Sequence, residues 1–232
     1  DSNKPVLERI TRELEKLPLR GLVVSNPGGI QWAREHFAGM PLILDYPFNL
    51  MNDFSIEFLA QEQVQGVTLS PELSFKEIAQ LCIPPTVEVE GIIHGALPLM
   101  ISEHCVLGGV VGGRTEEEPC SAPCNKQSFR LRDRKNYSFP VETDQFCRMH
   151  IFNSQDLCLI EHLPSFRELG YHRLRIEARR ERADYVRKVT GIYRQALDRL
   201  AAGLETGWEE KRQVLEKLSP FGLTKGHYFR GV

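Results

Sequence analysis

The chain has 232 residues, of which 41% are hydrophobic and 26% are charged, and its formal net charge is -2 at pH 7. This composition is typical of a soluble globular protein, and it excludes an overall basic field that would draw the molecule to nucleic acid or to an anionic membrane. No apolar run approaches the roughly 18 residues that a membrane span needs, and the first residues lack a signal-peptide pattern, so we expect a cytoplasmic protein.

Short apolar runs alternate with amphipathic segments along the first part of the chain. Ser74 and Glu77 have the spacing of a capping box, which marks the start of one of the predicted helices. The predicted strands cover residues 21–25, 42–46, 66–70 and 87–95, and the predicted helices cover 6–17, 30–37, a segment beginning near 55, and 74–81.

A late strand over 173–178 leads into a long helix that runs to about Leu200. Alternating strands and helices predict right-handed βαβ units around a parallel sheet, so the fold class is α/β. The five predicted strands fit the C-terminal part of a (β/α)8 TIM-type barrel over residues 1–200, and the missing strands would precede Asp1.

The ends of the chain predict a fragment of a longer protein. The sequence has no initiator Met, and Tyr228, Phe229 and Val232 at its other end have the character of a strand. We therefore expect residues 201–232 to be an extension that leads into a further segment.

The regular pattern is interrupted between the fourth and last strands for about 75 residues, which is much longer than an ordinary connection. We place an insertion at 98–160, and alternation on either side of Lys135 and Asn136 predicts a β-hairpin over 128–144 within it. Because barrels carry their chemistry at the C-terminal ends of the strands, an insertion after the fourth strand is expected to be functional.

Six cysteines are too few for a disulfide scaffold in a chain of this size, and metal binding or catalysis is the better expectation. Cys82 and Cys158 lie in apolar runs and are predicted to be buried. The other four lie in the insertion, where four thiolates could hold a tetrahedral zinc ion or an iron-sulfur cluster. Their long and unequal spacing favours a cluster whose ligands come from separate loops. These four cysteines are Cys105, Cys120, Cys124 and Cys147.

Several segments together resemble the collagenase-like peptidase U-32 family. They are IIHGALPLMISEHC, PCSAPC, FPVETDQFCRMHIFNSQDLCLIEHLP and LRIEARRERADYVRKVTGIYRQALD. The resemblance extends from about Leu19 to Leu200, and the ordered series of motifs makes it specific.

The resemblance implies a (β/α)8-type barrel with an oxygen-sensitive 4Fe-4S cluster held by four cysteines. It also implies a role in the hydroxylation of tRNA, ribosomal RNA or ubiquinone precursors without molecular oxygen, with prephenate as the oxygen donor in some members. The expected substrate is therefore RNA or a small aromatic metabolite. The older name of the family implies a collagenase-like peptidase.

The ligand set carries over residue by residue from the same resemblance. Cys105, Cys120 and Cys147 match cysteines of the family, whereas Pro98 stands where many relatives have a cysteine. Some branches of the family use a C-x3-C pair, which makes Cys124 the natural replacement for the cysteine that is missing at Pro98.

Other family positions carry over as candidate substrate-binding residues. His94 matches an HG turn but could equally serve as a structural residue at the end of its strand. Glu177 and Arg179 match a strand end and could instead form a structural ion pair. The remaining candidates are Asn49 and Asn52, in a stretch that begins with Tyr46, and Glu72, beside Pro71 where the family has an arginine.

The densest basic run of the sequence has two interpretations. A solvated face is the default, and an RNA contact is the alternative. The run comprises Arg173, Arg175, Arg179, Arg180 and Arg182.

A peptidase needs an activated nucleophile or an activated water, and the sequence contains neither HExxH nor GxSxG. His104 and Cys105 are adjacent, but adjacency does not give the geometry of a Cys-His dyad. The leading hypothesis is therefore an iron-sulfur protein in oxygen-independent hydroxylation. A collagenase-like peptidase and a structural zinc module with four cysteine ligands are the alternatives.

Overall fold

The computed structural model describes residues 4–204 and 206–230. The chain divides into two compact units. Unit 1 contains the residues up to Ile92, His162–Arg175, and the residues from Gly226 onward, and unit 2 contains Ile93–Glu161 and Ile176–Lys225. Each unit is built from segments that are distant in the sequence.

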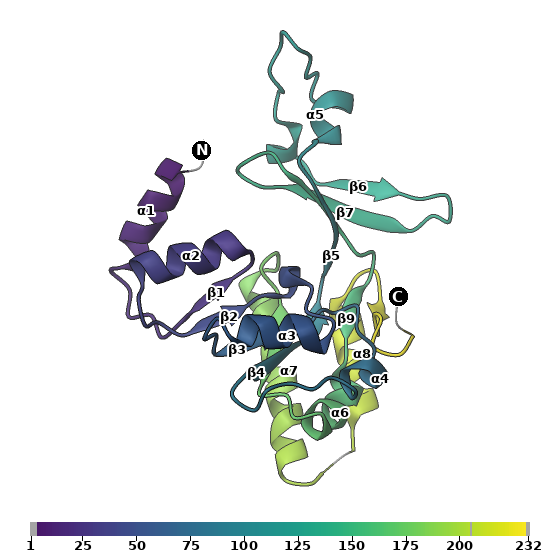
Figure 1. Ribbon diagram of the computed structural model, residues 1–232. Coiled ribbons are helices and arrows are strands. Elements are labelled where there is room, and N and C mark those ends of the chain that lie inside the picture. The colour runs from purple at the N-terminus through teal and green to yellow at the C-terminus, as the bar shows by residue number, and fades with distance from the viewer. Residues whose placement is uncertain (1–3, 205, 231–232) are drawn as a thin grey trace. The chain divides into compact units, whose positions relative to one another are not determined.

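Unit 1 is an α/β unit around parallel strands (Figure 1). Strands β1, β2, β3 and β4 pair in this order, all in parallel. The backbone N–H of His172, just before β10, donates to the carbonyl of Val89 in β4 at 2.9 Å. The elements that begin in this unit are α1 (Lys4–Leu14), β1 (Leu22–Val24), α2 (Pro27–His36), β2 (Leu42–Leu44), η1 (Tyr46–Phe48), α3 (Asp53–Ala60), β3 (Gly66–Thr68), α4 (Phe75–Ile78), β4 (Glu88–Gly95), α6 (Leu163–Glu168) and β10 (Arg173–Glu177).

Local sequence signals account for these elements. Leu44 and Val67 are almost completely buried in the apolar strands β2 and β3. The predicted capping box is confirmed, since Glu77 N–H donates to Ser74 Oγ at 3.3 Å and Ser74 N–H donates to Glu77 Oε2 at 2.8 Å. The helix that follows is shorter than predicted and ends at Ile78.

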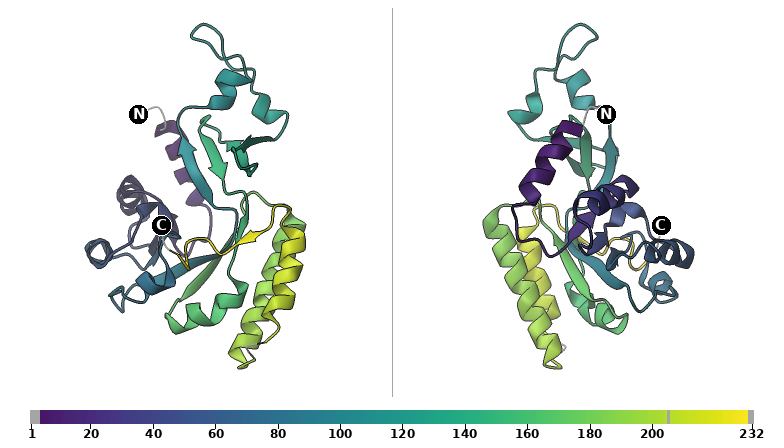
Figure 2. Two further views of the ribbon diagram at one scale, coloured as in Figure 1. Left: turned by 90° about the vertical axis from the view of Figure 1, so that its right-hand side faces the viewer. Right: turned by 60° about the vertical axis from the view of Figure 1, so that its left-hand side comes forward.

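Unit 2 contains a four-stranded antiparallel sheet in the order β5-β8-β7-β6, and the predicted hairpin is confirmed as β6 and β7. The last residues of β4 pair with β9, which pairs with β11. Helices α7 and α8 run side by side in both views of Figure 2. The elements are β5 (Pro98–Ser102), α5 (Val106–Val110), η2 (Pro123–Asn125), β6 (Phe129–Arg132), β7 (Ser138–Thr143), β8 (Met149–Phe152), β9 (Asp156–Cys158), η3 (Ile160–His162), α7 (Ala183–Ala201), α8 (Trp208–Leu218) and β11 (Leu223–Thr224).

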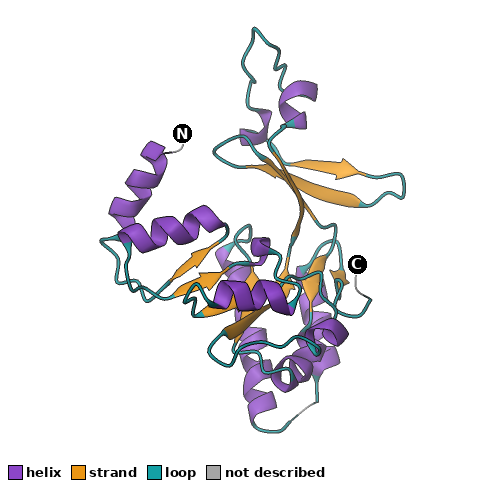
Figure 3. Ribbon diagram, in the orientation of Figure 1, coloured by secondary structure: helices purple, strands orange, loops and turns teal. Residues whose placement is uncertain are grey.

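The predicted mixed α/β class with parallel strands is confirmed, whereas the barrel stays a prediction because the described strands do not close into one. The insertion is more regular than predicted, since it supplies β5, β8 and β9 as well as the hairpin. Figure 3 shows the segment between α5 and β6 as loop with one short helical turn. No helix among the described residues is both long enough and apolar enough to cross a membrane.

The strand predicted at Tyr228 and Phe229 is wrong, because both residues lie in a turn. The Tyr228 hydroxyl donates to the Ile92 carbonyl at 3.1 Å, and its ring lies against Phe75 and Phe166. The Tyr228 side chain, and not strand pairing, therefore attaches this segment to unit 1. The third residue of that prediction, Val232, lies outside the described residues.

Candidate functional site

A buried polar network lies at the carboxyl ends of the parallel strands of unit 1. Ser25 follows β1, Asp45 follows β2, and Thr68 ends β3. Glu90 of β4 and Arg175 of β10 complete the network, and the Asp45 and Arg175 side chains are 8% and 20% exposed. Because parallel α/β sheets bind ligands at the carboxyl ends of their strands, this network is the site that the fold favours in unit 1.

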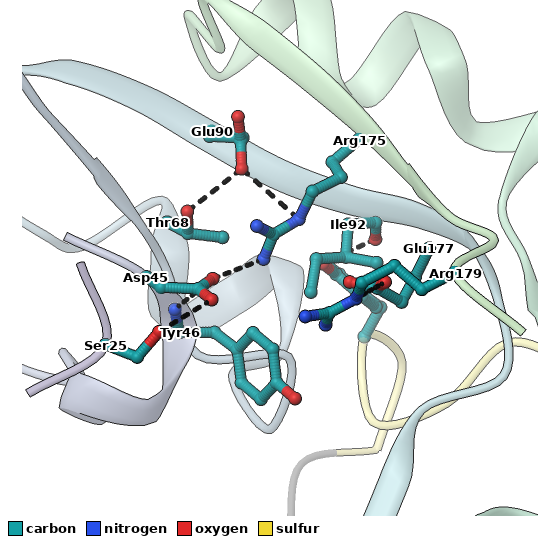
Figure 4. A network of polar contacts seen from close by, with 10 residues as sticks. Ser25, Asp45, Tyr46, Thr68, Glu90, Ile92, Arg175, Glu177 and Arg179 are labelled. Carbon is teal, nitrogen blue, oxygen red and sulfur yellow. Dashed lines mark hydrogen bonds and ion pairs between the residues drawn. The ribbon is translucent and has the colours of Figure 1, made fainter. Parts of the chain in front are cut away.

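Arg175 lies between the two carboxylates of the network (Figure 4). Its Nη2 atom lies 2.5 Å from Asp45 Oδ1, and its Nε atom lies 3.3 Å from Glu90 Oε1. The Ser25 hydroxyl donates to Asp45 Oδ2 at 3.3 Å, and the Thr68 hydroxyl donates to Glu90 Oε1 at 3.0 Å. Because the network contains two carboxylates and one guanidinium, it suits a ligand that donates hydrogen bonds better than it suits an anionic ligand.

The sequence patterns did not select this network, although Arg175 belongs to the predicted basic run. One signal was available for part of it. Ser25 and Asp45 are the first polar residues after the apolar runs LVV and LIL, and polar residues at that position of a parallel strand meet at one edge of the sheet. Glu90 and Arg175 carry no such signal, because both lie inside strands.

Glu177 and Arg179 form an ion pair, as the structural interpretation of these residues predicts. The Arg179 Nε atom lies 2.5 Å from Glu177 Oε1, and the Glu177 side chain is only 8% exposed whereas that of Arg179 is 71% exposed. Gly95 lies beside this strand end at φ +116, and a Cβ atom there would stand 1.9 Å from the Glu177 carbonyl oxygen. Only glycine fits between the two strands at this point.

His94 is completely buried in unit 2 between two tyrosines. Its Nε2 atom lies 2.9 Å from the Tyr185 hydroxyl and its Nδ1 atom lies 3.3 Å from the Tyr193 hydroxyl. Since the Tyr193 hydroxyl donates to the Ile93 carbonyl, Nδ1–H donates to Tyr193 and Nε2 accepts from Tyr185. Burial lowers the pKa of His94 to about 4, so the ring is neutral at pH 7.

The remaining family positions have local structural contacts. Asn52 is the N-cap of α3, where its Oδ1 atom accepts from the Ser55 N–H at 2.9 Å. Asn49 ends η1 in the left-handed region, at φ 52. Glu72 is exposed, and its backbone N–H donates to Ser70 Oγ at 3.4 Å. Their predicted contacts with a substrate stay predictions.

The four cysteines predicted as ligands all belong to unit 2, and two of them lie at the same end of its antiparallel sheet. Ser102 pairs with Met149 at the last position of the β5–β8 ladder. Cys105 lies three residues after Ser102, and Cys147 lies two residues before Met149. The two segments that carry Cys105 and Cys147 therefore lie next to each other where they join the ladder.

The other two cysteines are grouped around α5. The Cys120 Sγ atom packs so closely against the segment after this helix that a Cβ atom at Gly112 would stand 2.3 Å from the sulfur. Cys124 lies in η2, which packs against α5, and Cys105 is the N-cap residue of α5. Leu107 of α5 packs on the core of the antiparallel sheet and so holds this arrangement on the sheet.

These cysteines fit a metal centre in kind. All four are thiols without a disulfide, as an all-cysteine site requires. In the described parts of the chain, however, no three His, Cys, Asp or Glu side chains already converge at metal-binding distance. Loading a cluster would therefore require side-chain movement, and Cys147, at the unusual φ of 59, lies in the turn that joins β7 and β8.

Pro98 and the α5 group lie at opposite ends of β5. Pro98 opens the strand opposite Phe152, whereas Ser102 closes it opposite Met149. Cys124, in η2 beside α5, therefore does not lie at the position of Pro98, and its role as a replacement ligand stays a prediction.

The two remaining cysteines differ from each other. Cys158 is buried as predicted, and burial raises the pKa of its thiol. The prediction for Cys82 is wrong, because this residue is exposed. It lies just after the short helix α4, where its backbone N–H donates to Asp53 Oδ1 at 2.9 Å and its side chain faces away from the core.

Every arginine of the predicted basic run has an acidic partner. This pairing neutralises most of the charge that the run shows in the sequence. The pairs are Arg173 with Glu88, Arg175 with Asp45 and Glu90, Arg179 with Glu177, Arg180 with Glu142, and Arg182 with Asp184.

The adjacent residues His104 and Cys105 do not form a dyad. The His104 N–H donates to Ser102 Oγ at 3.1 Å, and its carbonyl accepts from the same hydroxyl at 3.0 Å. Across the residues that the structure describes, no hydrogen bond joins a histidine ring to a cysteine thiol. The described residues therefore provide no Cys-His dyad for the peptidase alternative.

Known proteins with assigned names resemble the chain along most of its length. The tRNA hydroxylation protein P of Escherichia coli strain K12 is 30% identical over 95% of this chain and 58% of the relative. The uncharacterized protease MJ0090 of Methanocaldococcus jannaschii is 28% identical over 91% of this chain and 52% of the relative. The tRNA hydroxylation protein P of Haemophilus influenzae is 28% identical over 88% and 54%. The chain thus spans about half the length of the curated relatives it matches.

No solved structure matches the chain. The profile of Peptidase family U32, in contrast, matches residues 1–231. Since this match covers nearly the whole sequence, the resemblance is confirmed, and the chain belongs to Peptidase family U32.

Proposed function

We propose that the chain is part of an iron-sulfur protein that takes part in oxygen-independent hydroxylation of an RNA base. The observation that carries the proposal is the placement of Cys105, Cys120, Cys124 and Cys147, which all belong to one end of the antiparallel sheet of unit 2. The names of two relatives, which are tRNA hydroxylation proteins, support the RNA substrate.

Cys105, Cys120, Cys124 and Cys147 are the proposed ligands of a 4Fe-4S cluster. When bound, such a cluster supplies electron transfer or an iron site that holds a substrate. The chain itself contributes the scaffold. Leu107 anchors α5 to the sheet, and Gly112 leaves the space that the Cys120 sulfur fills.

Prephenate enters this proposal as the oxygen donor that the family resemblance implies. A small aromatic metabolite is the substrate that the resemblance offers in place of RNA. The relatives named for tRNA hydroxylation favour RNA over the metabolite.

The direct test is anaerobic purification followed by analysis of iron, acid-labile sulfide and zinc. We expect iron and sulfide in equal amounts, at roughly four of each per chain. A variant with all four cysteines changed to serine should contain neither. Zinc without sulfide would select the structural zinc module, and a protein without metal after reconstitution would contradict the proposal.

A matched pair of glycine variants tests whether the α5 region holds the ligand. Gly112→Ala places a methyl group where the Cys120 sulfur lies, whereas Gly109→Ala places one in open space on α5. We expect Gly112→Ala to lose most of the bound iron and Gly109→Ala to retain it. Equal loading of the two variants would exclude Cys120 as a ligand. Circular dichroism separates loss of the cluster from loss of the fold.

A further inference from the structure

The β6–β7 hairpin carries a second group of cations, in addition to the arginine run over 173–182. Arg130 and Arg132 lie on β6, and Arg134 and Lys135 lie in the turn. All four are exposed. The stretch from Phe129 to Tyr137 contains a single acidic residue, Asp133.

The carboxylate of Asp133, the acidic residue of this stretch, accepts hydrogen bonds from the backbone of the turn. Asp133 Oδ1 accepts from the N–H groups of Lys135 and Tyr137, each at 2.8 Å. Arg130 donates to the Ser138 hydroxyl at 2.7 Å and to the Ser138 carbonyl at 2.8 Å, neither of which carries a charge. Within residues 4–204 and 206–230, the other three cations have no ion pair.

A groove of about 630 Å³ lies at the base of the hairpin, and Cys124 forms part of its wall. Lys126, Arg130 and Arg180 line it together with one acid, Glu142. Glu142 is paired with Arg180 at 2.6 Å, so among the described residues Lys126 and Arg130 have no acidic partner. Burial, and then the nearby charge of Arg180, lower the pKa of Arg130, as expected for two guanidinium groups that share one groove.

We propose that the β6–β7 hairpin and the groove at its base bind the phosphate backbone of RNA. Guanidinium groups bind phosphates in a bidentate manner, and an unpaired exposed arginine retains its donors for this purpose. Tyr137, 51% exposed beside the cations, provides a face on which a base can stack, which favours RNA over an acidic polypeptide. The inference rests on the proposed function, because the groove brings the bound strand to Cys124, a proposed ligand.

The test is the binding of a labelled RNA stem-loop to the anaerobically purified protein over a series of salt concentrations. The hairpin variant combines Arg132→Gln, Arg134→Gln and Lys135→Gln. Removal of these charges should lower the slope of log K against log salt by roughly 2 to 3, and should weaken binding at low salt roughly tenfold or more.

The matched control combines Arg187→Gln, Lys188→Gln and Lys217→Gln, which removes the same charge from exposed positions on α7 and α8 of the same unit. It should bind RNA as the parent protein does. Equal weakening by both variants would show a general charge effect and overturn the inference. Displacement of the RNA by polyglutamate as readily as by unlabelled RNA would also overturn it, in favour of an acidic polypeptide.

Iron and sulfide analysis of the same samples separates this inference from the proposed function. If the parent protein holds a cluster and the hairpin variant binds RNA as the parent does, the inference fails and the proposed function stands. If the parent binds RNA through the hairpin but holds no cluster, the proposed function fails and the inference stands. A parent protein that binds no RNA overturns the inference.

Discussion

The arginine run over 173–182 and the hairpin segment over 126–135 are both basic in sequence, but the structure uses their charges differently. Each arginine of the run lies beside a carboxylate, and Arg175 is largely buried between Asp45 and Glu90. The hairpin cations are exposed, and the acid closest to them in sequence, Asp133, is bound to the backbone of its own turn. The density of charge in a sequence therefore does not tell which charges are available to a partner.

The difference has an energetic reason. A buried cation is retained only where a carboxylate offsets its loss of hydration, so burial and pairing occur together. An exposed cation keeps its water and gains little from a nearby acid. The buried member of the run, Arg175, therefore contributes to the stability of the fold, whereas the exposed hairpin cations are available for binding.

The largest effect is expected for Arg175→Met. This change leaves the buried carboxylates of Asp45 and Glu90 without their counter-charge, and it should lower the free energy of unfolding by about 3–5 kcal/mol. Chemical denaturation measures it. Arg182→Gln, in the same run but with a side chain 93% exposed, is the matched control and should change little. Similar losses in both variants would contradict the distinction between buried and exposed arginines.

His94 extends the comparison to a basic residue that is buried without charge. Its pKa is lowered from 6.5 to about 4 in the folded protein, so between these values the unfolded chain binds the extra proton. Stability is therefore fully present above pH 6.5 and falls as the pH decreases toward 4, by about 3 kcal/mol from this group. Denaturation at several pH values measures the slope. His94→Gln should flatten it, and an unchanged slope would exclude His94 as its source.

An intermediate effect is expected for Asp133→Ala. The variant loses the acceptor of two backbone N–H groups in the hairpin turn, which should destabilise the turn by about 1 kcal/mol. Hydrogen exchange at the amides of Lys135 and Tyr137 measures this. Asp133→Asn retains an acceptor and should protect these amides. Unchanged exchange in the alanine variant would show that the turn does not depend on this side chain.

The smallest effect on stability is expected for Arg134→Gln. The side chain is exposed and has no ion pair in the described part of the chain, so the free energy of unfolding should change by less than about 0.5 kcal/mol. RNA binding should nevertheless weaken. A loss of stability comparable to that of Arg175→Met would remove the distinction between the two basic regions.

Much of the fold could be predicted from local patterns. The β-hairpin and the Ser74–Glu77 capping box are encoded within a few residues, and the structure contains both. The strand predicted at Tyr228 and Phe229 was wrong because a side-chain anchor replaces strand pairing there: the Tyr228 hydroxyl donates to the Ile92 carbonyl. The prediction that Cys82 is buried was also wrong. Apolar neighbours in the sequence do not determine which way a side chain points in the segment after a short helix.

The sequence by itself determined the α/β class, the order of most elements, the family, and the four cysteines that a cluster would need. Only the tertiary structure decided which charges are neutralised and which cysteines are neighbours. The physical reason is that these properties depend on contacts between distant residues. Asp45 and Arg175 are 130 positions apart, and their attraction exists only after the strands that carry them have packed.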